Sequence, residues 1–150
     1  MDDIDRELLR VLQKDARTSY ADLARRVGLS APSVHERIRK LEREGTLRGT
    51  HADVDPRAVG LAVSALVGLQ QREGVEADDI VSALREVEAV EDCWFVAGDE
   101  AFVVKVRVAD LEALDRTLSL LRNVPGVTRT RTTVVLSTRF EGRHRVPDNP

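Results

Sequence analysis

Hydrophobic residues recur at helical spacing through the first fifty residues of the chain, and this pattern predicts three helices. The stripe of the first helix, at i, i+4, i+7 and i+8, consists of Ile4, Leu8, Val11 and Leu12. The second and third helices are predicted to begin behind Ser19 and Ser30, which are favoured N-cap residues. Gly28 and Gly45 stand where these two helices should end, because glycine readily takes the left-handed conformation found there.

The spacing of small and apolar residues across the second and third helices is typical of a helix-turn-helix. Counted from Tyr20 as the first position, Ala24 is fifth, Gly28 is ninth and Val34 is fifteenth. Three further inward positions are apolar: Leu23, Val27 and Leu29. The following segment, TLRGTHADV, alternates loosely and predicts a short two-stranded wing. We therefore expect residues 1–50 to form a winged helix-turn-helix domain.

Beyond residue 60 the hydrophobic period changes to two, which is typical of strands. Strands are predicted at 61–69, 92–98, 100–108 and 127–140, and helices at 74–87 and 109–126. The order βαββαβ is that of a ferredoxin-like domain, expected over residues 61–138. The fold class is then α+β, with residues 51–60 as a β-linker and residues 139–150 as a loose C-terminal tail.

The strand predicted at 61–69 has apolar residues on both faces. The two helices of a ferredoxin-like domain cover only one face of its sheet, so the other face needs a second cover. A second copy of the chain is the simplest cover, and a homodimer is expected.

The third helix has a polar and basic face opposite its apolar one. The N-terminal half of such a helix contacts base edges, and four residues are predicted to do so: Pro32, Ser33, Glu36 and Lys40. Ser30, Arg37 and Arg39 are predicted to contact phosphates. His35 lies on a flank, where it either packs against the protein or faces DNA. A plain three-helix domain is the alternative, but it does not explain this basic face.

The net charge of −3 is unevenly distributed along the chain. Residues 1–50 contain 11 Lys and Arg against 9 Asp and Glu, whereas residues 51–150 contain 12 against 17. An N-terminal part of charge +2 and a C-terminal part of charge −5 suggest that only the first part meets a polyanion.

Several classes of protein are excluded by what the sequence lacks. No apolar run approaches the roughly 20 residues that span a bilayer, and MDDIDRELL is not of signal-peptide type, so we expect a cytoplasmic protein without a membrane partner. Cys93 is the only cysteine and is expected to be a small buried residue. The histidines lack metal-ligand spacing: His35, His51 and His144. No cofactor, metal site or enzymatic activity is expected, because no set of catalytic groups converges.

Four stretches match one family in particular: DDIDRELLRVLQKDARTSYADLARRVGLS, VHERIRKLEREGTLRGTHADVDPRAVG, VEDCWFVAGD and VPGVTRTRTTVVL. Through them the chain resembles the Lrp/AsnC (leucine-responsive/asparagine-type, feast/famine) family of transcriptional regulators. The resemblance implies double-stranded DNA as a partner, an amino acid as effector, dimers formed by the ferredoxin-like domain and further assembly into octamers.

The resemblance also places the effector site. The family's Gly-Asp-aromatic-Asp loop falls on Gly98, Asp99, Glu100 and Ala101, and a stretch of the last strand falls on residues 133–135, which are Thr133, Val134 and Val135. Two interpretations stay open, because Glu100 replaces an aromatic residue and Ala101 replaces a carboxylate. The loop either selects a different ligand, such as one with a cationic amine, or is an ordinary turn in a regulator that binds DNA, or organises it, without an effector.

Overall fold

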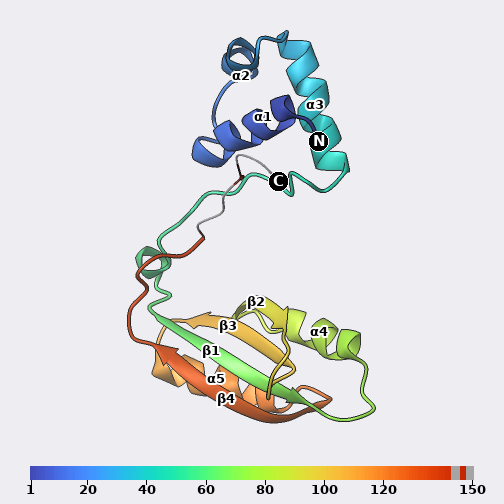
Figure 1. The fold of residues 1–150 in the computed structure, drawn as a ribbon. Coiled ribbons are helices and arrows are strands. Elements are labelled where there is room, and N and C mark those ends of the chain that lie inside the picture. Colours follow the sequence, from blue (N-terminus) through green and yellow to red (C-terminus); the bar gives the residue numbers. More distant parts are fainter. Residues whose placement is uncertain (143–145, 148–150) are drawn as a thin grey trace. The chain divides into compact units, whose positions relative to one another are not determined.

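The computed structural model describes residues 1–142, 146 and 147, and it divides the chain into two compact units (Figure 1). The first unit contains Met1–Asp53 together with the described residues from Phe140 onward. The second unit is Val54–Arg139. The division between Asp53 and Val54 falls inside the range expected to link two domains.

The first unit contains the three expected helices, α1 (Asp3–Lys14), α2 (Tyr20–Val27) and α3 (Ala31–Arg43). Their apolar stripes meet in one core, whose buried residues are Leu8, Leu23, Ala24, Val34 and Ile38. Ser19 and Ser30 cap α2 and α3 as predicted, each accepting a hydrogen bond from a backbone N–H three residues on. Gly28 has a φ of 68°, which ends α2 and makes the turn into α3.

The predicted two-stranded wing is not formed, and residues 44–62 contain no strand. Nearly all side chains of this segment are exposed and only Leu47 packs on the helical core. A two-stranded ribbon that buries so little apolar surface is not stable by itself. The expected β-linker likewise contains a short 3₁₀ helix, Pro56–Val59, which Asp55 caps and Gly60 ends.

The second unit has the element order predicted for a ferredoxin-like domain. Its elements are β1 (Val63–Gln71), α4 (Ala77–Arg85), β2 (Val90–Phe95), β3 (Phe102–Val108), α5 (Leu111–Arg122) and β4 (Val127–Val135). All pairings in the sheet are antiparallel and the strand order is β2-β3-β1-β4. The α+β fold class is therefore confirmed.

One face of the sheet packs against α4 and α5 and forms the core of this unit (Figure 1). Alternate residues of β3 face this core and are buried: Phe102, Val104, Val106 and Val108. Leu111 is exposed, because it is the first residue of α5 and precedes the turn that reaches the core.

Cys93 is exposed, so the expectation that it is buried is wrong. It lies on the edge strand β2, beside a hollow of about 480 Å³ between α4 and β2. Cys93 and Phe95 line this hollow and are therefore only partly covered by α4. Partial burial nevertheless raises the pKa of the Cys93 thiol above its ordinary value.

The other face of the sheet has no helix over it (Figure 1). Leu66 is the only large apolar side chain that β1 directs to this face, so the strand is less apolar there than its sequence pattern indicated. Leu66 is 40% exposed and Trp94 of β2 is 47% exposed. Beside them Glu91 forms ion pairs with Lys105 and Arg107 at 2.8 and 2.9 Å.

The described part of the C-terminal segment contacts α1, whereas the sequence predicted a loose tail. The backbone N–H of Val146 donates a hydrogen bond to the side-chain oxygen of Gln13 at 3.0 Å. Arg10 donates to the carbonyl oxygen of Pro147 at 2.9 Å. Contacts made largely by backbone atoms leave no pattern in a sequence, which is why this one was missed. Within the described chain, no helix combines the length and apolar character needed to cross a bilayer.

Candidate functional site

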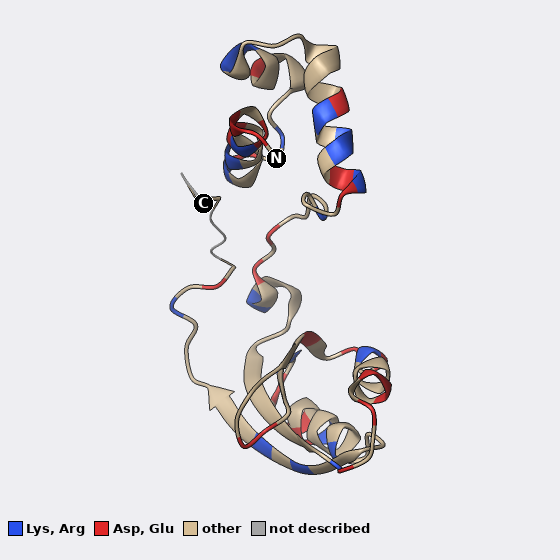
Figure 2. Cartoon of the chain, turned by 45° about the vertical axis from the view of Figure 1, so that its right-hand side comes forward, with Lys and Arg blue, Asp and Glu red and all other residues tan. Residues whose placement is uncertain are grey.

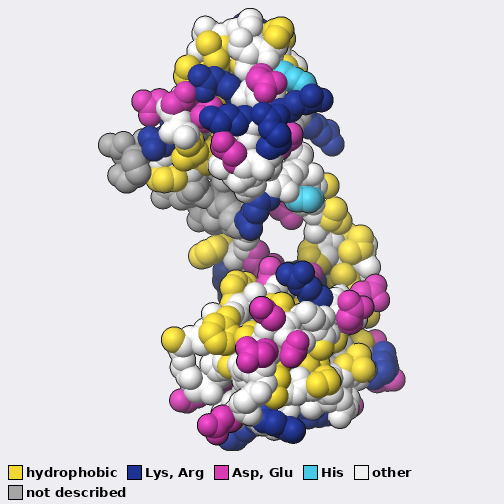
Figure 3. Space-filling view, turned by 90° about the vertical axis from the view of Figure 1, so that its right-hand side faces the viewer, with side chains coloured by type: hydrophobic (Ala, Val, Ile, Leu, Met, Phe, Trp, Pro, Cys, Tyr) yellow, Lys and Arg dark blue, Asp and Glu magenta, His cyan; other side chains and the backbone are white. Residues whose placement is uncertain are grey.

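The outward face of α3 carries the residues that the sequence predicted for base contacts. All four are exposed: Pro32, Ser33, Glu36 and Lys40. Arg39 and Arg43 are exposed on the same helix. Figure 2 shows Lys and Arg positions along α3, and Figure 3 shows Lys and Arg side chains gathered on this face of the unit. The opposite side of α3 is held in the core by Val34 and Ile38, which fixes the direction of the basic face.

The cations of this face are only weakly engaged by neighbouring acids. Lys40 lies 3.8 Å from Glu44, and Arg43 lies 3.2 Å from Glu36. Exposed pairs of this kind stabilise a fold by about 0–1 kcal/mol, so phosphate can replace the acid at little cost. Among the described residues, Arg39 has no ion-pair partner.

Arg37 is directed away from this face, toward α1. Its guanidinium lies 2.7 Å from a carboxylate oxygen of Asp2 and 2.8 Å from one of Asp5. Asp5 itself is buried, and sequence analysis did not single it out. The two carboxylates raise the pKa of Arg37. The geometry thus departs from the expected phosphate contact, because Arg37 joins the recognition helix to α1.

His35 packs on the flank of α3, which was one of its two predicted positions. Its ring meets the ring of Tyr20 edge-on, with the ring centres 5.1 Å apart. The contact joins α3 to the first residue of α2, so the imidazole supports the angle between these helices.

Ser30 lies at the N-terminus of α3, where its hydroxyl caps the helix. Its oxygen accepts a hydrogen bond from the backbone N–H of Ser33 at 3.3 Å, and the two hydroxyl oxygens are 2.8 Å apart. The free N–H groups and the dipole at a helix N-terminus favour an anion such as phosphate.

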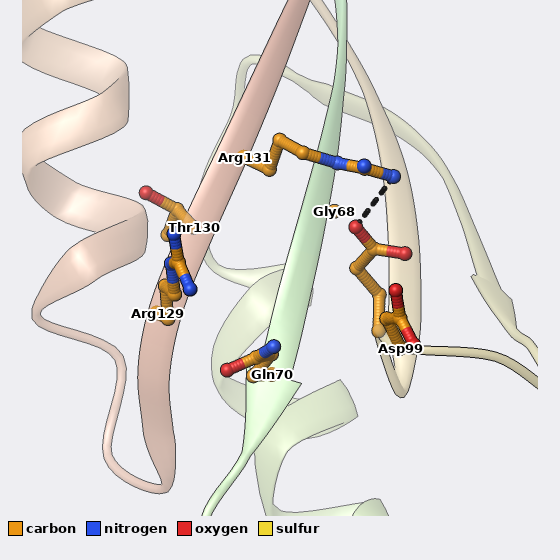
Figure 4. A pocket seen from close by; sticks show the side chains of 7 residues that line it. Gly68, Gln70, Asp99, Arg129, Thr130 and Arg131 are labelled. Atoms are coloured by element: carbon orange, nitrogen blue, oxygen red, sulfur yellow. Dashed lines mark ion pairs between the residues drawn. The ribbon is translucent and has the colours of Figure 1, made fainter.

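A second candidate site is a pocket of about 140 Å³ on the ferredoxin-like unit (Figure 4). The residues that line it are Gly68, Gln70, Asp99, Glu100, Arg129, Thr130 and Arg131. Asp99 and Glu100 were predicted from the family's loop. Sequence analysis did not include the lining residues from β1 and β4, although a glycine inside an apolar strand is a signal that another group approaches it closely.

An ion pair crosses this pocket. The carboxylate of Glu100, from the loop after β2, lies 2.7 Å from the guanidinium of Arg131 on β4, and the dashed line in Figure 4 marks this pair. Gly68 lies directly beneath, and a Cβ atom placed on Gly68 would be 2.6 Å from Cγ of Glu100. The absence of a side chain at Gly68 therefore makes room for Glu100.

The pairing of the strands separates the loop from the predicted stretch of the last strand. Gly68 pairs with Arg131, whereas Thr133 pairs with Leu66 and Val135 with Ser64. The β4 residues that line the pocket are therefore at 129–131, not at 133–135. Thr133, Val134 and Val135 lie farther along the strand, and Gly98 and Ala101 are in the loop but do not line the pocket.

The described residues contain no group of three or more His, Cys, Asp or Glu side chains placed to hold a metal ion. His144, the third histidine considered in the sequence, lies outside the described residues.

Comparisons with known proteins identify both units. The AsnC-type helix-turn-helix domain matches residues 1–42, and the Lrp/AsnC ligand binding domain matches residues 63–144. The HTH-type transcriptional regulator LrpA of Mycobacterium tuberculosis is 41% identical over 147 residues, 98% of this chain and 97% of that protein. The leucine-responsive regulatory protein of Escherichia coli K12 is 38% identical over 142 residues, 91% of this chain and 85% of that protein.

Solved structures match nearly the whole chain. The feast or famine regulatory protein from M. tuberculosis, complexed with L-methionine, has a TM-score of 0.90 and 41% identity, covering 97% of this chain and 99% of that one. The structure of E. coli AsnC has a TM-score of 0.83 and 28% identity, covering 98% and 99%. Transcriptional regulation, and not enzymatic catalysis, is the function common to these relatives. The chain belongs to the Lrp/AsnC family of helix-turn-helix transcriptional regulators.

Proposed function

We propose that α3 enters the major groove of an operator and that Pro32, Ser33, Glu36 and Lys40 contact bases. The observation that carries this proposal is the exposed, basic face of α3 on a helix whose other side is locked in the core. A regulator with this partner acts where the chromosome is, so we expect a cytoplasmic location.

The side-chain contacts of the structure change the proposed phosphate contacts. Ser30 and Arg39 remain, and exposed Arg43 joins them. Arg37 is removed from the set because Asp2 and Asp5 already hold its guanidinium. His35 supports the helix from its flank through Tyr20 and is not proposed as a base contact.

Gel-shift titrations with the region upstream of the protein's own gene and with random DNA of equal length test this function. We expect tighter binding to the upstream region. Equal affinity for the two DNAs would instead support the alternative of a protein that organises DNA without selecting a sequence. Absence of binding to both would contradict the proposal.

We further propose that the part of the helix-free sheet face around Leu66 and Trp94 is the surface of a homodimer. Leu66 and Trp94 are large side chains left exposed there, and a second copy of the same face would cover them. Analytical ultracentrifugation should show at least a dimer for the wild-type protein and a shift toward monomer for Leu66→Asp. A wild-type monomer contradicts the proposal. The same experiment distinguishes a dimer from the octamer that the family resemblance implies.

The pocket beside Asp99 and Glu100 is the proposed effector site, and an α-amino acid is the proposed effector. Two solved relatives were complexed with L-methionine, the M. tuberculosis protein and a regulator from Neisseria meningitidis with a TM-score of 0.84, 26% identity and 94% coverage of this chain. Gly98 and Ala101 shape the loop, and Thr133, Val134 and Val135 are proposed to contribute only where a second copy adjoins.

A thermal-shift screen against all twenty amino acids tests this part of the proposal. A ligand that binds only the folded protein stabilises it by about 2.7 kcal/mol at a hundredfold excess over its Kd. Stabilisation by one or a few amino acids supports effector sensing. A uniform lack of response would favour effector-independent DNA binding, the interpretation suggested by Ala101.

A further inference from the structure

The carboxylate of Glu100 is a fixed acceptor in the pocket. Its side chain is only 15% exposed, because it lies flat over the backbone of Gly68. The loop that carries it is attached to the sheet by two backbone hydrogen bonds, from the N–H of Ala101 to Leu69 and from the N–H of Val96 to Ala101, both at 2.9 Å. These bonds fix the backbone on either side of the Glu100 side chain, and the close approach to Gly68 limits where that side chain can lie.

The guanidinium of Arg131 is, in contrast, a movable donor. Its side chain is 74% exposed, and the ion pair with Glu100 is the contact that holds its end over the pocket (Figure 4). An ion pair with one exposed partner contributes little to folding, so it opens readily when a competing charge arrives. Opening it leaves a carboxylate and a guanidinium that face each other across a hollow of about 140 Å³.

These two groups have the charges complementary to the head group of an α-amino acid. An ammonium is bound by a carboxylate, and a carboxylate is bound by a guanidinium through two parallel hydrogen bonds. We propose that the effector's head group inserts into the Glu100–Arg131 pair, with its ammonium on Glu100 and its carboxylate on Arg131. This inference rests on the proposed effector function and specifies how the site recognises its ligand.

The exchange replaces the ion pair between Glu100 and Arg131 by two ion pairs to the ligand. Only a ligand that carries both charges forms both of them and therefore binds most tightly. A ligand with an ammonium alone must displace Arg131 and leaves the guanidinium unpaired. A carboxylate alone leaves Glu100 unpaired, and this loss is larger because Glu100 is mostly buried. The site is thus selective for a zwitterion, and the pocket recognises the head group whatever the effector's side chain is.

Isothermal titration calorimetry on the full chain tests this with three probes: L-methionine, 3-(methylthio)propylamine, which lacks the carboxylate, and 4-(methylthio)butanoate, which lacks the ammonium. Wild type should bind L-methionine at least tenfold more tightly than either analogue. Glu100→Gln and Arg131→Gln should each weaken L-methionine binding at least tenfold. Glu100→Gln frees Arg131 and should strengthen butanoate binding, whereas Arg131→Gln frees Glu100 and should strengthen amine binding.

A matched control is available on α5, where Glu112 and Arg116 form an ion pair of the same 2.7 Å length outside the pocket. Glu112→Gln and Arg116→Gln should leave all three affinities unchanged. Gly68→Ala adds a second test, because its Cβ would displace Glu100 and should weaken L-methionine binding without removing a charge.

Three results would overturn the inference. Unchanged L-methionine affinity in Glu100→Gln and Arg131→Gln contradicts it while leaving amino-acid sensing intact. A loss in Arg129→Gln but not in Arg131→Gln would assign the carboxylate to the other arginine of the pocket. Failure of wild type to bind L-methionine or any other amino acid contradicts the proposed effector function itself, and the inference with it.

Discussion

Arg37 and Arg131 are both arginines paired with carboxylates, yet the two pairs differ in what surrounds them. Arg37 lies between α1 and α3 and is 32% exposed, and the side chain of its partner Asp5 is only 8% exposed. Arg131 is 74% exposed, and a hollow adjoins its pair. Burial makes the first pair a permanent link in the DNA-binding unit, whereas exposure makes the second one able to open for a ligand.

The largest expected effect comes from breaking the buried pair. Arg37→Gln should lower the free energy of unfolding of the first unit by about 2 kcal/mol, because Asp5 would remain buried without its cation. Urea denaturation followed by circular dichroism measures this change. Arg131→Gln is the matched variant and should change the free energy of unfolding by less than about 0.5 kcal/mol. Equal losses in the two variants would remove the distinction between a structural and an exchangeable pair.

A cation on the opposite face of α3 should affect DNA binding and not folding. Lys40→Ala should weaken operator binding about five- to tenfold and flatten the dependence of log affinity on log salt, since one cation that contacts the DNA at a base edge is lost. Gel shifts at several salt concentrations measure both quantities. Lys14→Ala, at the exposed end of α1, is the control and should change neither. Unchanged binding in Lys40→Ala would contradict the assigned contact.

The smallest effect concerns the ionisation of Asp2. The backbone N–H of Asp5 and, after it, the guanidinium of Arg37 lower the pKa of Asp2 below its ordinary value. A lowered pKa in the folded state contributes stability above the unfolded value, and this contribution disappears as the pH falls through the folded value. In Arg37→Gln the pKa of Asp2 should rise but stay below its ordinary value, because the N–H of Asp5 is retained. NMR titration of the carboxyl carbon measures it, and an unchanged pKa would show that Arg37 does not act on Asp2.

Much of the DNA-binding unit was predictable because its determinants are local. The apolar stripes, the serine caps and the turn at Gly28 all act within a few residues, and the structure confirms them. Helical spacing also placed Pro32, Ser33, Glu36 and Lys40 outward correctly. It could not show that Arg37 would be bound by Asp2 and Asp5, since residues some 30 positions apart meet only when the helices pack.

The effector pocket was only partly predictable for the same reason. The family's loop placed Asp99 and Glu100, but the residues opposite them depend on the register between β1 and β4. That register brings Arg131 beside Gly68 and keeps Thr133 at the level of Leu66. The sequence of either strand does not show which of its residues will pair with which residue of the other strand.

The sequence by itself determined the order of helices and strands, the helix-turn-helix, the ferredoxin-like domain and the family, because hydrophobic period, capping and turn chemistry operate over short distances. The tertiary structure alone decided which charged side chains form buried ion pairs, as Arg37 does, and which form exposed pairs that a ligand can displace, as Arg131 does. It also showed that the wing strands are absent and that Cys93 is exposed. These outcomes depend on burial and on distant partners, and the chain acquires both only when it packs.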